Sequence, residues 1–348
     1  MDILVIYQFC TFGGVERVLL NRAKAIKQEN MDVCFHVGYL QDSGALDSFR
    51  QYIQANGLEE CLQPVLISQD IRLDKSPYDL VLVIDTPQVL CQNSSCSNLF
   101  IECHTPYVEN RQYLKNIPPN VKGILVPSKT FRATLRSEFK NLPEVYVLPN
   151  SVPDEFHDSP DAPLIFNKRP LAYLARIDPL KNYTEAMRIF EAVKEREDVM
   201  QIVIGNGITS RENLALLGDS HLLEKTFLRD RVAFDDVPEL IGLVRRHQGV
   251  FISPSRGESF GLSAAEFICG SVPVLLSYIP EHRELVNRDE RFLYPLGKIS
   301  VARKKLVKIL DNWQSMSQAI SNYSSKFRGA SFIQGWNRFL KAVGSAQG

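Results

Sequence analysis

The sequence has no excess of charge of either sign. Its 348 residues contain 40 lysines and arginines and 40 aspartates and glutamates, so the formal net charge is zero at pH 7. Proteins that hold nucleic acid do so largely through a positive surface that neutralises phosphates. The equal numbers of acidic and basic residues therefore argue against a nucleic-acid partner. Binding through a local basic patch stays an open alternative.

Long hydrophobic runs are also missing. No apolar run reaches the roughly 20 residues that a helix needs to cross a bilayer. The opening stretch, MDILVIYQFCTFGG, has neither the basic region nor the cleavage site of a signal peptide. We therefore expect a buried first strand and a cytoplasmic protein.

Cysteine is scarce and scattered. The seven cysteines are odd in number and several lie inside apolar runs, which predicts reduced thiols. Cys91, Cys96 and Cys103 come close to His104 in the sequence, but their spacing does not match a zinc knuckle. We expect no metal site and no cofactor. The cysteines are Cys10, Cys34, Cys61, Cys91, Cys96, Cys103 and Cys269.

Most of the sequence is predicted to form alternating strands and helices. Short apolar, β-rich runs such as DILVIYQF, YDLVLVID and GVFISPS are separated by amphipathic helical patterns. Such alternation predicts an α/β protein with two Rossmann-like domains, each built on a parallel sheet. We expect an N-terminal domain over 1–150, a second domain over 168–328, and a C-terminal helix, 329–348, that crosses back to the first.

Several polar or glycine-containing segments follow predicted strands, where open parallel sheets bind ligands. Gly13 and Gly14 precede a helix, but the three spaced glycines of a dinucleotide-binding fingerprint are absent, which disfavours a nicotinamide enzyme. His104 follows the strand in NLFIECH. Arg176 and Lys181 bracket one loop in LARIDPLKN and could neutralise a diphosphate, although a solvated surface pair is an open alternative.

The stretch SPSRGESFGLSAAEFICG contains two glutamates on either side of a predicted helix start. Backbone N–H groups at such a start favour an anion, so Phe260, Gly261 and Leu262 are candidates for holding a phosphate. Glu258 lies before the helix and Glu266 within an apolar run, where a lone carboxylate is costly to bury.

The segments GGVERV, CHTP, ARIDPLKN, VIGNG and SRGESFGLSAAEF together resemble a retaining glycosyltransferase of the GT-B fold, in glycosyltransferase family four. The resemblance covers about residues 1 to 345, and its most specific part is the pair of glutamates eight positions apart. It implies that the second domain binds a nucleoside diphosphate sugar and that the first binds an acceptor.

The resemblance also implies individual roles. Glu258 would contact the donor sugar and Glu266 the ribose hydroxyls, while Arg176 and Lys181 would bind the diphosphate. His104 would lie beside the transferred sugar. By the same resemblance Gly13, Gly14 and Gly205 approach the ligands, and the backbone around Phe234 contacts the base.

The expected activity is hexose transfer from a UDP- or GDP-type sugar to a hydroxyl of a glycan or glycolipid, with retention and without a metal, in bacterial polysaccharide or glycoconjugate synthesis. An open alternative is a non-catalytic sugar-nucleotide-binding subunit of a glycosyltransferase complex. The segment from Lys122 to Lys140 carries five basic residues at near-helical spacing. One hypothesis is that this segment contacts anionic lipid at the inner face of a membrane. The simpler interpretation is a helix that faces solvent.

Overall fold

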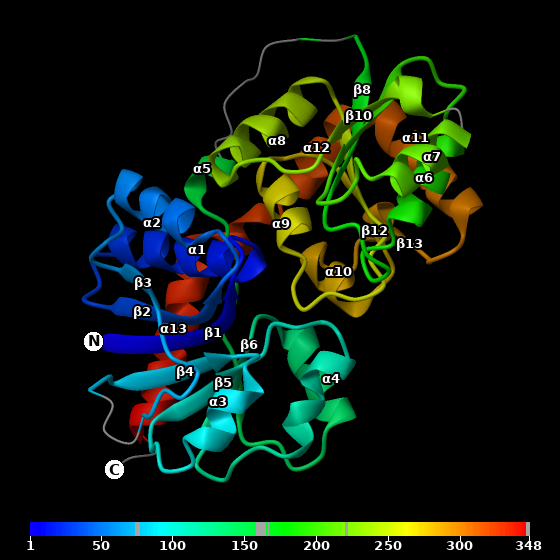
Figure 1. Cartoon of the computed structure of the whole chain (residues 1–348). Coiled ribbons are helices and arrows are strands. Elements are labelled where there is room, and N and C mark those ends of the chain that lie inside the picture. The colour runs from blue at the N-terminus through cyan, green and yellow to red at the C-terminus, as the bar shows by residue number, and fades with distance from the viewer. Residues whose placement is uncertain (74–76, 158–164, 166, 220–221, 346–348) are drawn as a thin grey trace. The chain divides into compact units, whose positions relative to one another are not determined.

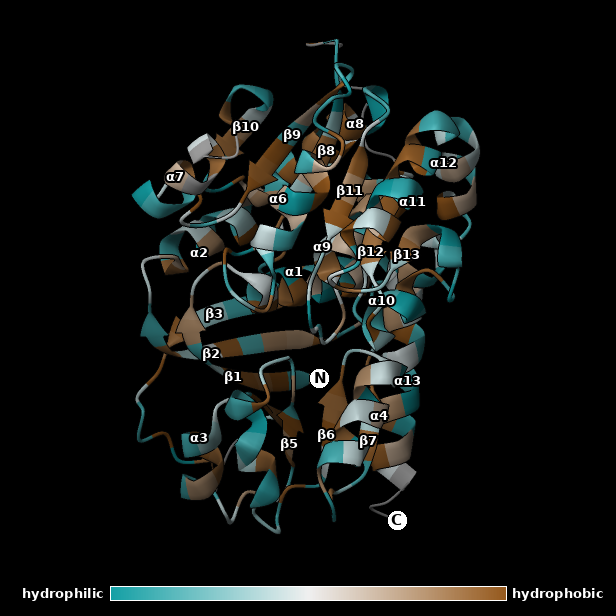
Figure 2. Ribbon diagram, turned by 90° about the vertical axis from the view of Figure 1, so that its right-hand side faces the viewer, coloured by the Kyte–Doolittle hydropathy of each residue, from teal (hydrophilic) through white to brown (hydrophobic). Residues whose placement is uncertain are grey.

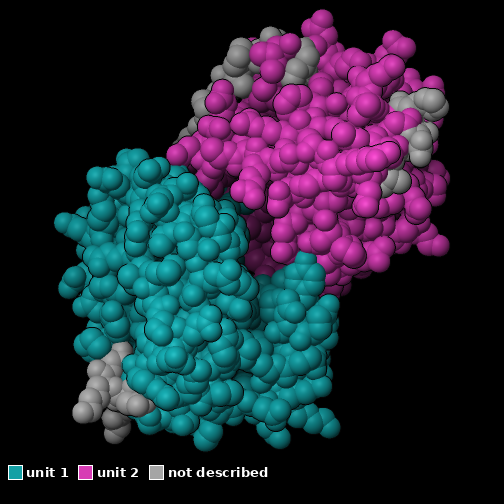
Figure 3. Space-filling model, in the orientation of Figure 1, with its two compact units in different colours: residues 1–153, 328–348 teal, residues 154–327 magenta. Residues whose placement is uncertain are grey.

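The chain folds into two compact units in the computed structural model, which describes residues 1–73, 77–157, 165, 167–219 and 222–345. Unit 1 contains residues 1–153 and 328–348, and unit 2 contains residues 154–327 (Figure 3). Unit 2 is therefore one continuous segment, whereas unit 1 is made from both ends of the chain.

Unit 1 is built on a seven-stranded sheet whose strands are all parallel. The strand order is β3-β2-β1-β4-β5-β6-β7, so the chain reverses its direction of travel across the sheet between β1 and β4. Figure 2 shows the strands of this sheet largely brown, as expected where helices cover both faces. The strands are β1 (Asp2–Cys10), β2 (Cys34–Asp42), β3 (Leu62–Leu66), β4 (Leu80–Ile84), β5 (Leu99–Glu102), β6 (Gly123–Val126) and β7 (Val145–Val147).

Helices form most of the connections between these strands, as is usual for parallel pairing (Figure 1). The first of them begins directly after Gly13, whose backbone N–H is capped by the side chain of Glu16. The connecting helices are α1 (Gly14–Gln28), α2 (Leu46–Ala55), α3 (Pro87–Gln92), the 3-10 helix η1 (Glu109–Lys115) and α4 (Lys129–Glu138), and the chain ends in α13 (Gly329–Ser345).

Unit 2 has a six-stranded parallel sheet of the same kind. Its order, β10-β9-β8-β11-β12-β13, reverses between β8 and β11. The strands are β8 (Arg169–Leu174), β9 (Val199–Ile204), β10 (Thr226–Arg229), β11 (Val250–Ser253), β12 (Val274–Ser277) and β13 (Leu293–Tyr294). The α-helices are α5 (Asp154–His157), α6 (Tyr183–Glu191), α7 (Arg211–Asp219), α8 (Val237–Arg246), α9 (Leu262–Cys269), α10 (Pro280–Leu285), α11 (Ile299–Asp311) and α12 (Trp313–Ser321). Four 3-10 turns complete the unit: η2 (Leu223–Lys225), η3 (Phe234–Asp236), η4 (Glu290–Phe292) and η5 (Ser324–Phe327).

These two sheets confirm the prediction of an α/β chain with two Rossmann-like domains. Open sheets of this topology bind ligands at the carboxyl ends of the strands beside the reversal point. That point lies between β1 and β4 in unit 1 and between β8 and β11 in unit 2. The structure thus offers one place in each unit in which to look for a site.

The C-terminal helix α13 packs on unit 1, to which it belongs. Trp336 is fully buried, and its ring contacts that of Phe35 on β2 at a centroid distance of 5.9 Å. One turn later Phe339 packs edge-on against Phe100 of β5 at 5.3 Å. The apolar face of this helix is therefore a core face, which joins the two ends of the chain in one unit.

The basic segment near residue 130 differs from the expected continuous helix. Lys122 precedes strand β6, and Lys140 follows the end of α4 at Glu138. Three of the five basic residues, Lys129, Arg132 and Arg136, lie on α4. The expectation failed because GILV forms a buried strand of the sheet, which leaves too little chain for a helix through all five residues.

Replacing Trp336 with alanine should destabilise unit 1 by about 3 to 5 kcal/mol, because it removes a fully buried aromatic side chain and leaves a cavity. Urea unfolding monitored by circular dichroism measures this loss. The exposed Gln334, on the same helix, provides a control because Gln334→Ala should change stability by less than about 0.5 kcal/mol. Equal effects of the two substitutions would contradict the packing of α13.

Candidate active site

A buried ion pair marks the reversal point of the sheet in unit 2. The ammonium group of Lys181, in the loop after β8, lies 2.6 Å and 2.7 Å from the two carboxylate oxygens of Glu258, in the loop after β11. Both side chains are largely buried, with exposed fractions of 16% and 10%. The structure therefore brings together two of the sequence-predicted residues that are 77 positions apart in the chain.

The loop that carries Lys181 is fixed by hydrogen bonds within unit 2. Asp178 accepts a hydrogen bond from the backbone N–H of Lys181 at 2.8 Å. The next residue, Asn182, has a left-handed backbone with φ of 56° and donates its side-chain amide to the carbonyl of Pro254 at 3.1 Å. The amide thus ties the β8 loop to the β11 loop. A left-handed position favours glycine or asparagine, which is why asparagine fits here.

Glu258 is held in its ionised form. Burial raises the pKa of its carboxyl group, but the positive charge of Lys181 and hydrogen bonds from Lys181 and Ser255 together outweigh burial, so the pKa is lowered. An ionised Glu258 can accept hydrogen bonds from ligand hydroxyls and cannot donate any.

A buried histidine that the sequence analysis did not identify belongs to the same cluster. His282, on α10, is fully buried, and burial lowers its pKa to about 4. Its Nδ1 lies 3.0 Å from the hydroxyl of Ser277, and its Nε2 lies 3.4 Å from the hydroxyl of Ser253. The ring is therefore neutral at physiological pH, and adds no positive charge beside Glu258.

Helix α9 starts directly behind Glu258. Its N-cap, Gly261, has a φ of 91°, in the left-handed region that favours glycine, and a Cβ there would lie 3.1 Å from Leu285. The first amide groups of a helix have no partner within the helix, and they carry the positive end of its dipole. The predicted phosphate-binding residues Phe260, Gly261 and Leu262 thus lie at this helix start.

Glu266 lies inside α9 and is fully buried. Its neighbours on the helix, Ala265 and Phe267, are also fully buried. Its place inside the helix is the one predicted from the sequence pattern.

Arg176 and Gly205 have different surroundings from those of Lys181. The guanidinium of Arg176 is 63% exposed and lies 3.4 Å from the carboxylate of Asp178, at the outer edge of the loop. A Cβ on Gly205, just after β9, would lie 2.2 Å from the carbonyl oxygen of Ala175. Strand packing alone therefore requires glycine at position 205. Phe234 begins the short turn η3 and is buried.

In unit 1, His104 follows β5 and is hydrogen-bonded to a buried glutamate. Its Nε2 lies 2.6 Å from Oε1 of Glu102, the last residue of β5. Glu102 in turn accepts a two-pronged hydrogen bond from the guanidinium of Arg22 on α1. The side chains of Arg22 and Glu102 are both 1% exposed, whereas that of His104 is 10% exposed.

The backbone on both sides of His104 is held by a second carboxylate. Asp85, at the end of β4, accepts hydrogen bonds from the N–H groups of His104 at 2.9 Å and Thr105 at 2.8 Å. Tyr113 donates its hydroxyl hydrogen to the other oxygen of Asp85 at 3.0 Å. Asp85 itself has a φ of 40°, an uncommon conformation for a residue other than glycine. These bonds fix the loop that carries the histidine.

Gly13 and Gly14 lie at the carboxyl end of β1, beside the reversal point of this sheet. The N–H of Gly13 donates to Oε2 of Glu16 at 2.6 Å, and Thr11 donates to the same oxygen at 3.4 Å. A Cβ on Gly14 would meet no atom within 4 Å. Gly13 is thus part of a helix cap, while position 14 is open to a molecule from outside.

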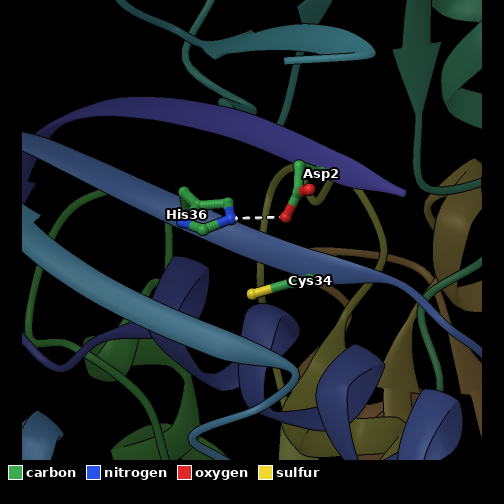
Figure 4. Close-up of side chains that lie close together, drawn as sticks. All are labelled: Asp2, Cys34 and His36. Carbon is green, nitrogen blue, oxygen red and sulfur yellow. Dashed lines mark hydrogen bonds and ion pairs between the residues drawn. The ribbon is translucent and has the colours of Figure 1, made fainter. Parts of the chain in front are cut away.

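One group of side chains within the described residues could in principle hold a metal ion. Asp2, Cys34 and His36 lie at the amino ends of β1 and β2, with ligand atoms within 4.8 Å of one another (Figure 4). Nε2 of His36 is only 2.8 Å from Oδ1 of Asp2. Two ligands on a tetrahedral zinc ion, with bonds of about 2.0–2.1 Å, are about 3.3 Å apart. The group is therefore described best as a hydrogen-bonded pair with a thiol nearby.

This group also lies at the opposite edge of the sheet from His104, because parallel strands begin at one edge and end at the other. All seven cysteines are free thiols. Among the helices of the described residues, none is long and apolar enough to cross a membrane.

Sequence reasoning missed Glu102, Arg22, Asp85 and His282. Glu102 and Arg22 each interrupt an apolar segment, LFIE and VLLNRAKAI, and a charge in such a place must find a partner. The same signal points to Glu266, the one charged residue of the apolar run LSAAEFICG. Asp85 directly follows the apolar run LVLVI, a position that was itself a signal. His282 has no such pattern, since histidine is ordinary in short helices.

The buried His282 should make unit 2 less stable in mild acid. The unfolded chain binds a proton at this residue below a pKa of about 6.5, whereas the folded protein does so only near its pKa of about 4. The free energy of unfolding should therefore fall as the pH drops from 6.5 to 4, by up to about 3 kcal/mol. Urea unfolding at a series of pH values, compared with His282→Asn, measures this part of the slope. An unchanged slope in the variant would contradict the assignment.

Part of the chain matches a known protein family. Residues 158–327 match the model of a family described as "Glycosyl transferases group 1". Among curated relatives, sucrose-phosphate synthase 1 of Arabidopsis thaliana is 29% identical over 191 residues, which is 47% of this chain and 18% of the relative. A probable sucrose-phosphate synthase 1 of Citrus unshiu is 31% identical over 131 residues, which is 33% of this chain and 12% of the relative. The chain thus spans less than a fifth of the length of these relatives.

Solved structures match over nearly the whole chain, at identities that show the fold alone. HepE of Anabaena, solved in complex with UDP and glucose, aligns with a TM-score of 0.75 at 16% identity, covering 98% of this chain and 100% of HepE. TarM aligns at 0.74 and 11% identity, covering 97% and 98%. Sucrose-phosphate synthase of Thermosynechococcus elongatus aligns at 0.70 and 13%, covering 99% of both. The chain accordingly has the GT-B fold, and most of its second unit is similar to the glycosyltransferase group 1 family.

Proposed function

We propose that this protein is a retaining glycosyltransferase that moves a hexose from a nucleoside diphosphate sugar to a hydroxyl of a glycan or glycolipid. The observation that carries the proposal is the pair of Lys181 and Glu258 at the reversal point of the unit 2 sheet, directly before the N-terminus of α9. This arrangement combines a cation, an ionised carboxylate and free helix amides at the place where such sheets bind ligands.

The cationic groups suit a departing diphosphate. Breaking the bond between sugar and phosphate leaves negative charge on the phosphate oxygens, which must be stabilised as it grows. Lys181, Arg176 and the amides at the start of α9 provide that stabilisation in the proposed mechanism. Loss of one such contact often costs about 3 kcal/mol in the barrier, or roughly a hundredfold in rate.

The pairing of Lys181 with Glu258 adds a feature to this mechanism. Without a ligand, the two charges neutralise each other at 2.6 Å. A bound diphosphate attracts the ammonium group as well, so Lys181 would lie between two anions. Glu258 remains ionised and is proposed to accept hydrogen bonds from hydroxyls of the donor sugar, while Glu266 is proposed to hold the ribose.

Similar proteins support a nucleotide-sugar donor. HepE has been solved with UDP-glucose, and the pneumococcal transferase GtfA with UDP and GlcNAc. Both share the fold of this chain at low identity, which makes UDP-type donors the first to test. The acceptor is proposed to bind unit 1, where His104 and the open position at Gly14 lie at the carboxyl edge of the sheet.

Retention is proposed to occur without a metal and without a covalent intermediate. A two-step reaction needs a carboxylate nucleophile close to the anomeric carbon. Glu258, the ionised carboxylate of the site, is already assigned to the sugar hydroxyls. We therefore propose a same-face reaction in which the leaving phosphate accepts the proton of the acceptor hydroxyl.

The donor site can be located by thermal-shift measurements with UDP, GDP and ADP. A ligand at 100 times its dissociation constant adds about 2.7 kcal/mol to folded-state stability. We expect one diphosphate to raise the melting temperature of the wild type, and Lys181→Met and Glu266→Ala to lose that shift. Lys298→Met removes an exposed lysine of the same unit and should keep it. Retention of the shift by both site variants would contradict the assigned donor site.

Turnover separates the enzyme from a non-catalytic binding subunit. If a nucleotide binds, we expect slow release of sugar from the corresponding UDP-sugar in the absence of acceptor, and NMR of a transfer product should show the anomeric configuration of the donor. Binding without any release or transfer would favour the non-catalytic alternative. An inverted product would contradict the retaining mechanism.

A further inference from the structure

The ring of His104 has one nitrogen engaged by protein and one that is not. Nε2 lies 2.6 Å from the carboxylate of Glu102. Within the part of the chain that the structure describes, Nδ1 makes no hydrogen bond. Because an ionised carboxylate only accepts hydrogen bonds, Nε2 must carry the hydrogen. In the neutral ring, Nδ1 is then the nitrogen that can accept a hydrogen bond.

Glu102 is kept ionised although it is buried. Burial raises the pKa of its carboxyl group, but Arg22 and His104 outweigh that effect, so the pKa is lowered well below its ordinary value. The Arg22 guanidinium is planar and always charged, and it engages both oxygens of Glu102. Glu102 therefore presents a fixed anion to the histidine.

The C-terminal helix α13 packs against Arg22, the partner of Glu102. The guanidinium carbon of Arg22 lies 5.7 Å from the centre of the Phe332 ring on α13. Phe332 is fully buried, so Arg22 cannot swing away from Glu102 without disturbing the core. A chain of contacts thus runs from Phe332 through Arg22 and Glu102 to His104.

A purely structural role explains this arrangement poorly. Replacing a buried ion pair by apolar side chains of similar size is often neutral or stabilising, so stability alone gives little reason to keep one. Asp85 already fixes the backbone at His104 and Thr105. What Glu102 adds is the orientation and the proton position of the imidazole, which matter only if the ring acts on a ligand.

We propose that Glu102 is a positioning residue that holds His104 with its hydrogen on Nε2, so that Nδ1 accepts a hydrogen bond from a hydroxyl group of the sugar substrate. The inference rests on the proposed glycosyltransferase function for the identity of the substrate. Arg22 acts one step further away, by keeping Glu102 ionised and in place.

The tautomer of His104 can be observed directly. Nitrogen-15 NMR of the histidine side chains, with His104→Gln used to assign the signal, should show the Nε2–H tautomer in the wild type at alkaline pH. In Glu102→Gln the side-chain amide can donate as well as accept, so we expect a mixture of the two tautomers. A wild-type ring with its hydrogen on Nδ1, or a tautomer unchanged by Glu102→Gln, would overturn the proposal.

Removing the charge of Glu102 leaves Arg22 buried and unpaired, so this variant can fail to fold. The double variant Arg22→Met/Glu102→Gln removes both charges and keeps the volume of the pair, and it should show the same tautomer change. Glu138→Gln is the matched control, because Glu138 makes a similar two-pronged pair with Arg111 in unit 1 and does not contact His104. It should leave the tautomer as in the wild type.

Kinetics give a second, independent result. We expect the double variant to lower kcat by about 10- to 100-fold, by analogy with the carboxylate partners of metal-binding histidines. Glu138→Gln should have normal kcat. A normal kcat in the double variant would overturn the positioning role. If the wild type has no turnover at all, the proposed function fails, and the NMR result still decides whether Glu102 sets the tautomer.

Discussion

Both candidate sites depend on the parallel direction of the strands. When all strands of a sheet run the same way, every loop that leaves a strand emerges at one edge, and helices return the chain to the other. Lys181 and Glu258 follow β8 and β11, which are neighbours in the sheet although 77 residues separate the two side chains. His104 and Asp85 are placed by the same rule at the ends of β5 and β4. Sheet order, more than sequence distance, decides which side chains meet.

Each unit then uses a buried ion pair to set the chemistry of a neighbouring group. In unit 2 the pair keeps Glu258 ionised, and in unit 1 it keeps Glu102 ionised. Charges of this kind are costly to bury, and removing one partner costs far more than replacing both. Their value lies in fixing the protonation state of a side chain at a place where water is partly excluded.

The sequence predicted the sheets better than it predicted the contacts of the site. Apolar runs and amphipathic helices indicate secondary structure because their periodicity is local. Glu258, Lys181 and His104 were found because each follows an apolar run, but nothing local shows that Lys181 reaches Glu258. Likewise the pairing of Glu102 with Arg22 spans 80 residues and depends on how α1 lies on the sheet. A charge inside an apolar segment signals that a partner exists without saying which one.

The order of the two units along the chain has a consequence for engineering. Unit 2 is encoded by one uninterrupted stretch, 154–327, inserted between two parts of unit 1. A gene fragment for unit 2 therefore needs only two cuts, whereas unit 1 alone requires Pro153 to be joined to Arg328 by a new linker. A natural or experimental truncation that removes the last twenty residues would leave unit 2 intact in sequence. It would instead remove Trp336 and Phe339 from the core of unit 1. A deletion at the 3′ end of the gene would therefore destabilise the domain that is encoded mainly by its 5′ end.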